Sequence, residues 1–326
     1  MKRNATNQIL QKAKASKSDE FYTQLIDIAR ELQHYEKCFQ DKVVYCNCDD
    51  PRTSNFFKYF KINFQRLGLK KLIASCYMGT KLDLFQASYS EPGLFCEYLG
   101  DQKDCTIKQF KEDGDFRSKE SIELLKKSDI IVSNPPFSLF REYIAQLVKY
   151  DKKFLVIGNI NAITYQEIFH LIQDNKVWLG VNLGRGISGF IVPAHYKLYG
   201  TEISRDVDGN AIVATNNCLW LTNLDTKQRH NDIALTKSYV ENPSEYLKYD
   251  NCDGINVNKT QEIPCDYEGL MGVPITFLHK YNPEQFEIVR FRKGDDGRDL
   301  SINGKCPYFR ILIKNRKIKQ HCINKS

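Results

Sequence analysis

Long hydrophobic runs are absent from this sequence of 326 residues. No stretch reaches the roughly 18 apolar residues that a membrane-spanning helix needs. Residues 1–21 are polar and basic and lack the apolar core of a secretory signal. The sequence shows no internal repeat and no low-complexity segment, which argues against repeat and fibrous architectures. We therefore expect a cytoplasmic protein with no membrane segment.

Cysteine pairs with the C-x-x-C spacing are also missing. The 11 cysteines are scattered, and the nearest two, Cys46 and Cys48, are separated by one residue. Structural zinc sites use C-x-x-C and related spacings, so we expect no metal. In a cytoplasmic protein these thiols should be reduced.

The chain does contain enough apolar sequence for a folded core, together with an excess of positive charge. Hydrophobic residues make up 42% of it, charged residues 27%, and the formal net charge is +7. That charge weakly favours an anionic partner. The length exceeds a typical domain of about 100–200 residues, so one large or two smaller domains are expected.

Short apolar runs alternate with amphipathic segments in the first half of the chain. Residues 54–69 and 138–150 place apolar side chains at helical spacing, with Ser138 as a candidate N-cap. The runs typical of buried parallel strands are 42–48, 70–77, 129–134 and 152–160. The alternation predicts an α/β fold with a doubly wound, mostly parallel sheet. Its functional residues should lie at the carboxyl ends of the strands.

The pattern changes after about residue 225. Before that point, two more strands flank a polar insertion, in the order 177–184, 185–216 and 217–224. Beyond it come turn-rich sequence, a strand, a short helix predicted to begin at Asn282-Pro283, and a last strand with a basic end. We therefore predict a domain at 1–225 and a smaller unit at 226–326.

The stretch DIIVSNPPFSLF, residues 129–140, joins a buried strand directly to two prolines. Pro135 and Pro136 have fixed φ angles and no N–H, and the residue before them, Asn134, is restricted to extended backbone. The result should be a rigid corner that carries an amide and the ring of Phe137. The carbonyls of the Asn134 side chain and the Pro135 backbone could each accept one N–H of an exocyclic base amine, with Phe137 stacked on the base. A base in a duplex must be flipped out to reach such a corner.

SNPPF resembles the N/D/S-P-P-Y/F signature of methyltransferases that act on exocyclic amines with S-adenosylmethionine. Over nearly the whole chain the sequence is similar to the EcoRI methylase family of adenine-N6 DNA methyltransferases. The similarity is seen in the stretches RNATNQILQKAKASKSDEFYT, VVYCNCDDPRTSNFFKYF, LLKKSDIIVSNPPFSLFREY, GVPITFLHKYNPEQFE and LSINGKCPYFRILIKN.

The resemblance implies a fold of the S-adenosylmethionine-dependent methyltransferase type, that cofactor, and no metal. It implies methyl transfer to a flipped adenine in double-stranded DNA, with GAATTC as the expected target. The protein would be the methyltransferase of a type II restriction-modification system, and the partner restriction endonuclease would share its target sequence. The catalytic residues implied are Asn134, Pro135, Pro136 and Phe137.

Three segments are implied to bind the cofactor: Phe21-Tyr22-Thr23 over its methionine part, Asp49-Asp50-Pro51 after the first strand, and Asp115-Phe116 at its adenine. The stretch CDDPRTSNF has no glycine where such enzymes usually have a glycine-rich loop. Either acid could hold the methionine, or both could cap the helix that follows at Ser54. The second strand ends in Ser75-Cys76-Tyr77, without an acid for the ribose. Asp115 could also belong to an ordinary turn.

Target recognition is expected in the smaller unit together with the insertion 185–216. Two basic segments could contact phosphates or be solvated tails, namely Lys2–Lys17 and the group Arg316, Lys317 and Lys319. The SNPPF corner fits RNA or cytosine-N4 methylation as well, because the amine chemistry is the same. A DNA-binding protein without catalysis is the alternative of another class, and the missing glycines favour it.

Overall fold

The structure is a computed structural model. It describes residues 22–82, 88–101, 105–182, 187–192, 203–205, 209, 211–213, 217–292, 300–306 and 309–319. The chain divides into two compact units. One consists of residues 1–162 and 179–224, and the other of residues 163–178 and 225–326.

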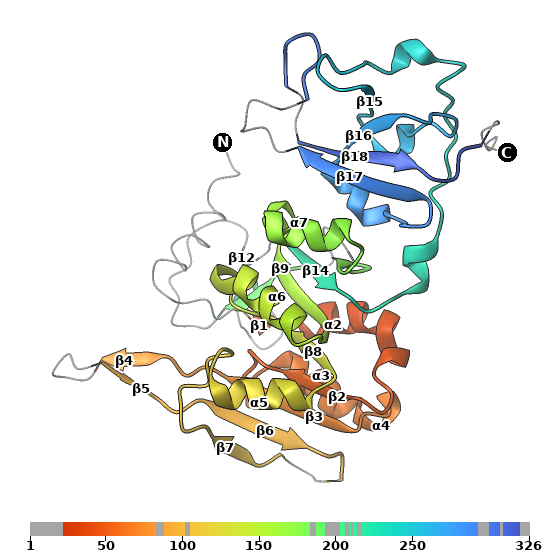
Figure 1. Cartoon of the computed structure of the whole chain (residues 1–326). Coiled ribbons are helices and arrows are strands. Elements are labelled where there is room, and N and C mark those ends of the chain that lie inside the picture. Colours follow the sequence, from red (N-terminus) through yellow and green to blue (C-terminus); the bar gives the residue numbers. More distant parts are fainter. Residues whose placement is uncertain are drawn as a thin grey trace. The chain divides into compact units, whose positions relative to one another are not determined.

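The first unit is built on an eight-stranded sheet in the order β10-β14-β9-β8-β2-β3-β6-β7 (Figure 1). The four central strands β9, β8, β2 and β3 run parallel, and antiparallel strands extend the sheet on both sides. The predicted doubly wound α/β fold is confirmed. In sheet order the strands are Trp178–Leu179, Cys218–Thr222, Lys153–Asn159, Ile130–Ser133, Val43–Cys46, Lys71–Cys76, Leu94–Tyr98 and Ile107–Gln109.

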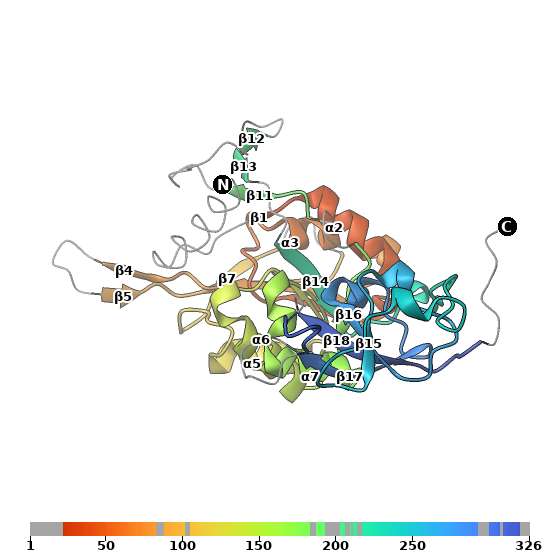
Figure 2. The same cartoon turned by 90° about the horizontal axis from the view of Figure 1, so that it is seen from above.

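Helices cover both faces of this sheet. On one face lie α5 (Lys119–Lys127) and α6 (Phe140–Lys149), and on the other α2 (Leu25–Leu32), α3 (Asn55–Ile62) and α4 (Phe64–Leu67) (Figures 1 and 2). Strands covered on both faces read as continuous apolar runs, and every residue of β8 is buried. None of the helices in the described part of the chain is long and apolar enough to cross a membrane.

Both predicted helices of the sheet are confirmed, with different ends. The segment 54–69 forms α3, capped by Ser54, and then α4, which ends at Gly68 with a left-handed φ of 62°. Ser138 is not an N-cap, because α6 begins only at Phe140. A 3-10 turn comes first, closed by the Leu139 N–H on the Pro136 carbonyl at 3.1 Å.

The predicted strand 177–184 is cut short to the two residues of β10. Gly180 lies against Glu31 of α2, where a side chain would collide with the carboxylate. The N–H groups of Val181 and Asn182 bind that carboxylate at 2.7 and 2.8 Å instead of a neighbouring strand. The chain then enters a second small sheet.

This small sheet has the order β1-β11-β13-β12 and is seen near the top of Figure 2, next to α2. Its strands are Tyr22–Thr23, Phe190–Val192, Ala211–Val213 and Ile203–Arg205. The N-terminal segment and the insertion therefore share one sheet, with Thr23 paired to Phe190. A separate hairpin, β4 (Thr80–Leu82) and β5 (Ser88–Ser90), projects from the unit (Figure 1).

The second unit contains α7 (Gln166–Gln173) and the sheet β15-β16-β18-β17, with strands Gly254–Asn256, Leu270–Pro274, Arg310–Asn315 and Phe286–Arg292. The helix predicted at Asn282-Pro283 is wrong. The Asn282 side chain accepts the Glu284 N–H, and its carbonyl accepts the Phe286 N–H, which makes a turn. FEIVRFR then pairs with β18 as β17.

The cysteines depart from the expected reduced thiols at one place in the first unit. Cys96 on β6 and Cys105, just before β7, form a disulfide with Cα atoms 6.2 Å apart. The antiparallel pairing of β6 and β7 brings the two residues together, because Cys96 lies opposite Ile107.

Candidate active site

The SNPPF corner follows β8 without a break. Ser133 is the last residue of the strand and is fully buried, Pro135 is buried, and Asn134 is half-buried with its side-chain oxygen shielded from solvent. Pro136 has extended backbone angles of −60° and 122° before the 3-10 turn. The corner therefore lies at the carboxyl edge of the parallel strands, as the sequence predicts.

Phe137 contacts the small sheet. Its ring is half-buried and lies edge-to-face on Phe190 of β11, with centroids 6.3 Å apart. Because Phe190 pairs with Thr23, the corner and the N-terminal segment meet through one residue of the insertion. Of the predicted Phe21-Tyr22-Thr23 segment, Phe21 and the side chain of Tyr22 lie outside the described residues.

Asp49 comes three residues after β2 and is 7% exposed. One carboxylate oxygen accepts the Ser54 hydroxyl at 2.7 Å, and the other accepts the Ser133 hydroxyl at 2.5 Å. The Asn134 N–H also binds the carboxylate. Burial raises its pKa to about 6, more than these hydrogen bonds lower it. The network joins the end of β2, the cap of α3 and the corner.

Asp50 and Asp115 lie in more open surroundings and have the same partner geometry as each other. In both cases the arginine two residues on donates its backbone N–H and Nε to one carboxylate oxygen. Arg52 adds Nη2 to the second oxygen of Asp50 at 2.5 Å, and Arg117 does the same for Asp115 at 2.7 Å. Hydrogen bonds from Arg117 hold the pKa of Asp115 below its ordinary value, although partial burial opposes them.

The loop that carries Asp115 is fixed against the end of β3. The Met78 N–H binds the Asp113 carbonyl at 3.2 Å. Gly114 has a φ of 80°, and a side chain there would strike the Cys76 carbonyl. Asp50 after β2, Asn134 after β8, and Asp115 on the loop held against the end of β3 therefore lie along one edge of the sheet.

Phe116 is 5% exposed and points into the core. Its ring lies edge-to-face on Tyr143 of α6, with centroids 5.2 Å apart. The Tyr143 hydroxyl donates to the Asn47 side chain at 2.5 Å. Phe116 thus joins its loop to α6 and to the residues that follow β2.

Sequence reasoning missed several of these residues. Arg52 and Arg117 had a visible signal, because both follow an acid in the pattern Asp-x-Arg. Asp27 and Glu31 also had one, since two acids four residues apart lie on the buried face of α2. Asp27 accepts the N–H and hydroxyl of Ser188, each at 2.8 Å, so α2 holds both ends of the segment that enters the small sheet. Phe190 had no signal in the sequence.

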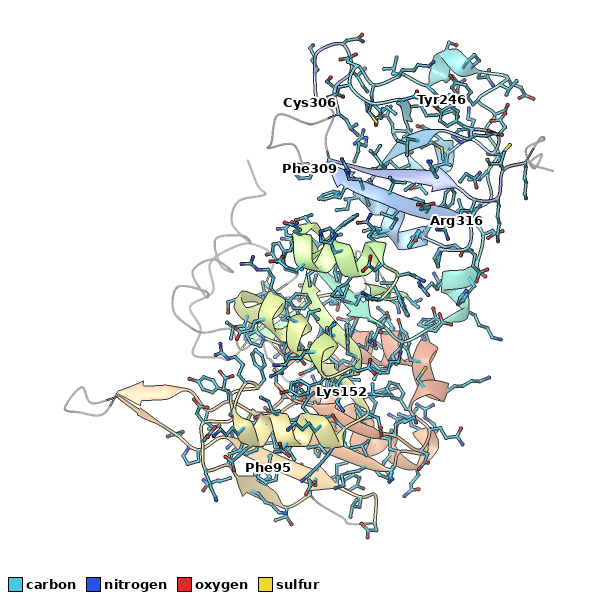
Figure 3. The ribbon with its side chains drawn as sticks, in the orientation of Figure 1. Phe95, Lys152, Tyr246, Cys306, Phe309 and Arg316 are labelled. Atoms are coloured by element: carbon cyan, nitrogen blue, oxygen red, sulfur yellow. A yellow bond between two sulfur atoms is a disulfide. The ribbon has the colours of Figure 1, made fainter. Side chains whose placement is uncertain are left out.

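The predicted basic group follows β18 in the second unit, where Figure 3 labels Arg316. Arg316 donates to the Pro283 carbonyl at 3.0 Å, and the Lys317 ammonium lies 2.8 Å from the Asp232 carboxylate. The Lys319 N–H binds the Cys265 carbonyl. The segment Lys2–Lys17 and most of 185–216 lie outside the described residues. Among those described, no three His, Cys, Asp or Glu side chains are grouped to hold a metal ion.

A family model and several known proteins match this chain over most of its length. The family model "Adenine-specific methyltransferase EcoRI" matches residues 9–299. Type II methyltransferase M.EcoRI of Escherichia coli is 64% identical over 98% of this chain and 100% of its own length. Type II methyltransferases M.MgeORF184P of Mycoplasma genitalium and M.MpnI of Mycoplasma pneumoniae are 38% and 35% identical, each over 94% of this chain and 98% of their own length.

No solved structure gives a significant match. The resemblance predicted from the sequence is confirmed by matches that extend from one end of the chain almost to the other. The chain belongs to the EcoRI family of adenine-specific methyltransferases.

Proposed function

We propose that this methyltransferase transfers the methyl group of S-adenosylmethionine to N6 of an adenine flipped out of duplex DNA, in the cytoplasm, and that its target is GAATTC. It would act in a type II restriction-modification system, protecting that sequence from a partner endonuclease. The observation that carries the proposal is the SNPPF corner at the carboxyl end of β8, on the same edge as Asp50 after β2 and Asp115 on the loop held against the end of β3. The relative at 64% identity supports the same activity.

The chemistry of the strand ends fits this cofactor. Its methionine part carries one ammonium and one carboxylate, and Asp50 with Arg52 offers one group of each sign at the partly exposed end of β2. Asp115 is a second carboxylate on the same edge, available to the polar atoms of the adenosine part. Both oxygens of Asp49 are engaged by buried serines, which supports Asp50 over Asp49 as the acid for the methionine. When bound, S-adenosylmethionine supplies a methyl group on a sulfonium, which needs no metal to activate it.

The residues of the corner orient the amine. The Asn134 side-chain carbonyl and the Pro135 carbonyl each accept one N–H of the adenine amine. These two hydrogen bonds orient the lone pair of the nitrogen toward the methyl donor. Pro135 and Pro136 keep these acceptors in place, so little reorganisation accompanies the reaction. Phe137, held by its edge-to-face contact with Phe190, stacks on the flipped base.

Target recognition belongs, in this proposal, to the unit 226–326 and the insertion 185–216. The basic segment Lys2–Lys17 would add phosphate contacts. The side chains that recognise the target are not those of the corner. The assignment of GAATTC as the target therefore rests on the similarity to M.EcoRI more than on any single contact.

The test uses labelled S-adenosylmethionine and two short duplexes that differ at one base pair, one of them containing GAATTC. N6-methyladenine found by mass spectrometry in the GAATTC duplex alone is the expected result. N4-methylcytosine, or methylation of RNA but not DNA, would replace the proposed substrate with one of its alternatives. Binding of DNA without any transfer would identify an inactive binder.

A further inference from the structure

We propose that Asp49 is a positioning residue for the catalytic corner, holding Asn134 in place through Ser133 and the backbone, and that it does not bind the cofactor. This inference rests on the proposed function, because the catalytic role of Asn134 is part of that function. It separates the two adjacent acids of the CDD stretch, which the sequence cannot tell apart.

The partners of Asp49 lie at the strand ends and at the start of α3, which together form the frame that supports the corner. Its N–H binds the Ser75 carbonyl of β3 at 2.8 Å, and one carboxylate oxygen binds Ser133 of β8. The Ser133 hydroxyl in turn accepts the Cys48 N–H at 3.1 Å. Asp49 thus joins the ends of three parallel strands, β3 through its backbone N–H and β8 through its carboxylate, which the Asn134 N–H binds directly.

The other carboxylate oxygen connects this frame to α3. It accepts the Ser54 hydroxyl, whose oxygen caps the helix by accepting the N–H groups of Phe56 and Phe57 at 3.1 and 3.3 Å. The positive end of the helix dipole therefore faces the carboxylate through Ser54. Ser54 and Ser133 are 4% and 0% exposed, so a cofactor would have to displace buried donors to reach Asp49.

Position 49 requires a negatively charged carboxylate rather than a neutral group of the same shape. An ionised carboxylate can accept from both serines and from the Asn134 N–H together, because both of its oxygens accept. An amide of the same shape has one oxygen and an NH2 group, so it leaves at least one of these donors facing a donor. Asn134 and the rest of the corner can then shift slightly. A small displacement of a catalytic group is enough to slow the reaction.

Burial makes this ionised group unfavourable for the folded state, since its hydrogen bonds do not offset its desolvation. In the described part of the chain, the ionisable groups that act on it are one acid, three thiols and one phenol: Asp50, Cys46, Cys48, Cys76 and Tyr143. Burial raises the pKa of each of these thiols and of the phenol, so they stay neutral near pH 7. A neutral Asn at position 49 avoids this desolvation, which offsets the donor that it leaves without an acceptor, so stability should be kept or raised while the rate falls.

The experiment compares Asp49→Asn with Asp129→Asn. Asp129 is a matched control, because it precedes the other end of β8 and its carboxylate also binds β2, through the Val43 N–H at 2.8 Å. Three quantities are measured for each protein: kcat on the GAATTC duplex at saturating cofactor, the Kd of S-adenosylmethionine by calorimetry without DNA, and Tm at pH 8.

For Asp49→Asn we expect kcat to fall about 10- to 100-fold, with Kd within threefold of the wild type and Tm equal or higher. Asp129→Asn should keep kcat within twofold. The kcat of the wild type should fall as the pH drops through about 6, and that step should be missing in Asp49→Asn. Ser133→Ala, which keeps the carboxylate, should lower kcat in the same direction without raising Kd.

A tenfold rise in Kd with an unchanged kcat would make Asp49 a cofactor ligand and overturn the inference. An unchanged kcat and Kd would overturn it as well. If Asp49→Asn does not fold, Ser133→Ala decides the question by the same two quantities. A wild-type protein that does not methylate the duplex counts against the proposed function instead, and the Kd and Tm of the variant still show whether Asp49 binds cofactor.

Discussion

Asp49 and Asp50 are neighbours in the chain and have opposite surroundings. Asp49 faces two buried hydroxyls and a backbone N–H, and burial raises its pKa to about 6. Asp50 lies at the partly exposed edge of the sheet in a bidentate pair with Arg52, and Asp115 repeats that arrangement with Arg117. Among the described residues, this edge of the sheet thus carries one carboxylate that forms no ion pair, Asp49, and two that each pair with an arginine.

The difference separates residues that build the site from residues that can meet a ligand. A buried carboxylate whose acceptors are all filled holds the backbone around it, because any movement leaves a donor without a partner. An ion pair at an exposed edge contributes little to stability and can exchange its partner for a charged ligand at small expense. The two kinds of acid should therefore respond differently to substitution, in rate, in affinity and in stability.

The largest effect is expected at the residue that Asp49 positions. Asn134→Ala removes the side-chain acceptor of the adenine amine and should lower kcat roughly 10²- to 10³-fold, the range seen when one preorganised polar group is removed from an active site. Cofactor and DNA affinities should stay near those of the wild type. Single-turnover methylation of the GAATTC duplex measures the loss, and a variant that methylates at the wild-type rate would contradict the role of Asn134.

A smaller effect, on affinity rather than rate, is expected at the exposed pair. Arg52→Ala removes a charged group that we assign to the methionine carboxylate and should raise the cofactor Kd about 10- to 100-fold, since a hydrogen bond to a charged group contributes about 1.5–3 kcal/mol. The kcat at saturating cofactor should change little. Calorimetry with S-adenosylmethionine measures this, and Arg66→Ala, whose partner Glu36 lies in another exposed pair, is the control.

Much of this arrangement follows from the sequence, because strand ends are marked by residues that cannot continue a strand. The apolar run Ile130–Val132 and the two prolines after it locate the corner and its edge of the sheet. The role of Asp49 does not follow, since its partners Ser54 and Ser133 are far apart in sequence and ordinary in composition. The contact between Phe137 and Phe190 likewise depends on a pairing between β1 and β11 that joins segments separated by most of the domain.

Two predicted elements failed for local physical reasons. Asn282-Pro283 has the composition of a helix start, and the Asn282 side chain accepts the Glu284 N–H as an N-cap would, but the FEIVRFR that follows pairs as a strand and leaves a single turn. The strand after Val177 ends early because the carboxylate of Glu31 takes the N–H groups that would bind a neighbouring strand. In the first case strand pairing outweighs a helix cap, and in the second a polar side chain outweighs an apolar strand pattern.

The smallest effects, and those that distinguish the two kinds of acid most directly, concern stability and pH. The pKa of Asp49 is raised from 3.8 to about 6, so its contribution to folding is fully present below about pH 4 and is lost as the pH rises through 6. Asp49→Asn should therefore gain stability relative to the wild type between pH 4.5 and 7.5, by on the order of 2 kcal/mol. The pKa of Asp115 is lowered, so its contribution is present at all pH values above about 4 and is lost only below them.

Asp115→Asn should accordingly show a constant deficit of about 1 kcal/mol or less over the same interval, because its ion pair is partly exposed. Urea unfolding of both variants and the wild type at pH 4.5, 6 and 7.5 measures the two trends side by side. Parallel pH curves for the two variants would mean that Asp49 titrates like an ordinary carboxyl. The distinction between a buried positioning acid and an exposed paired one would then have no basis in charge, and the hydrogen bonds of Asp49 alone would have to account for any loss of rate.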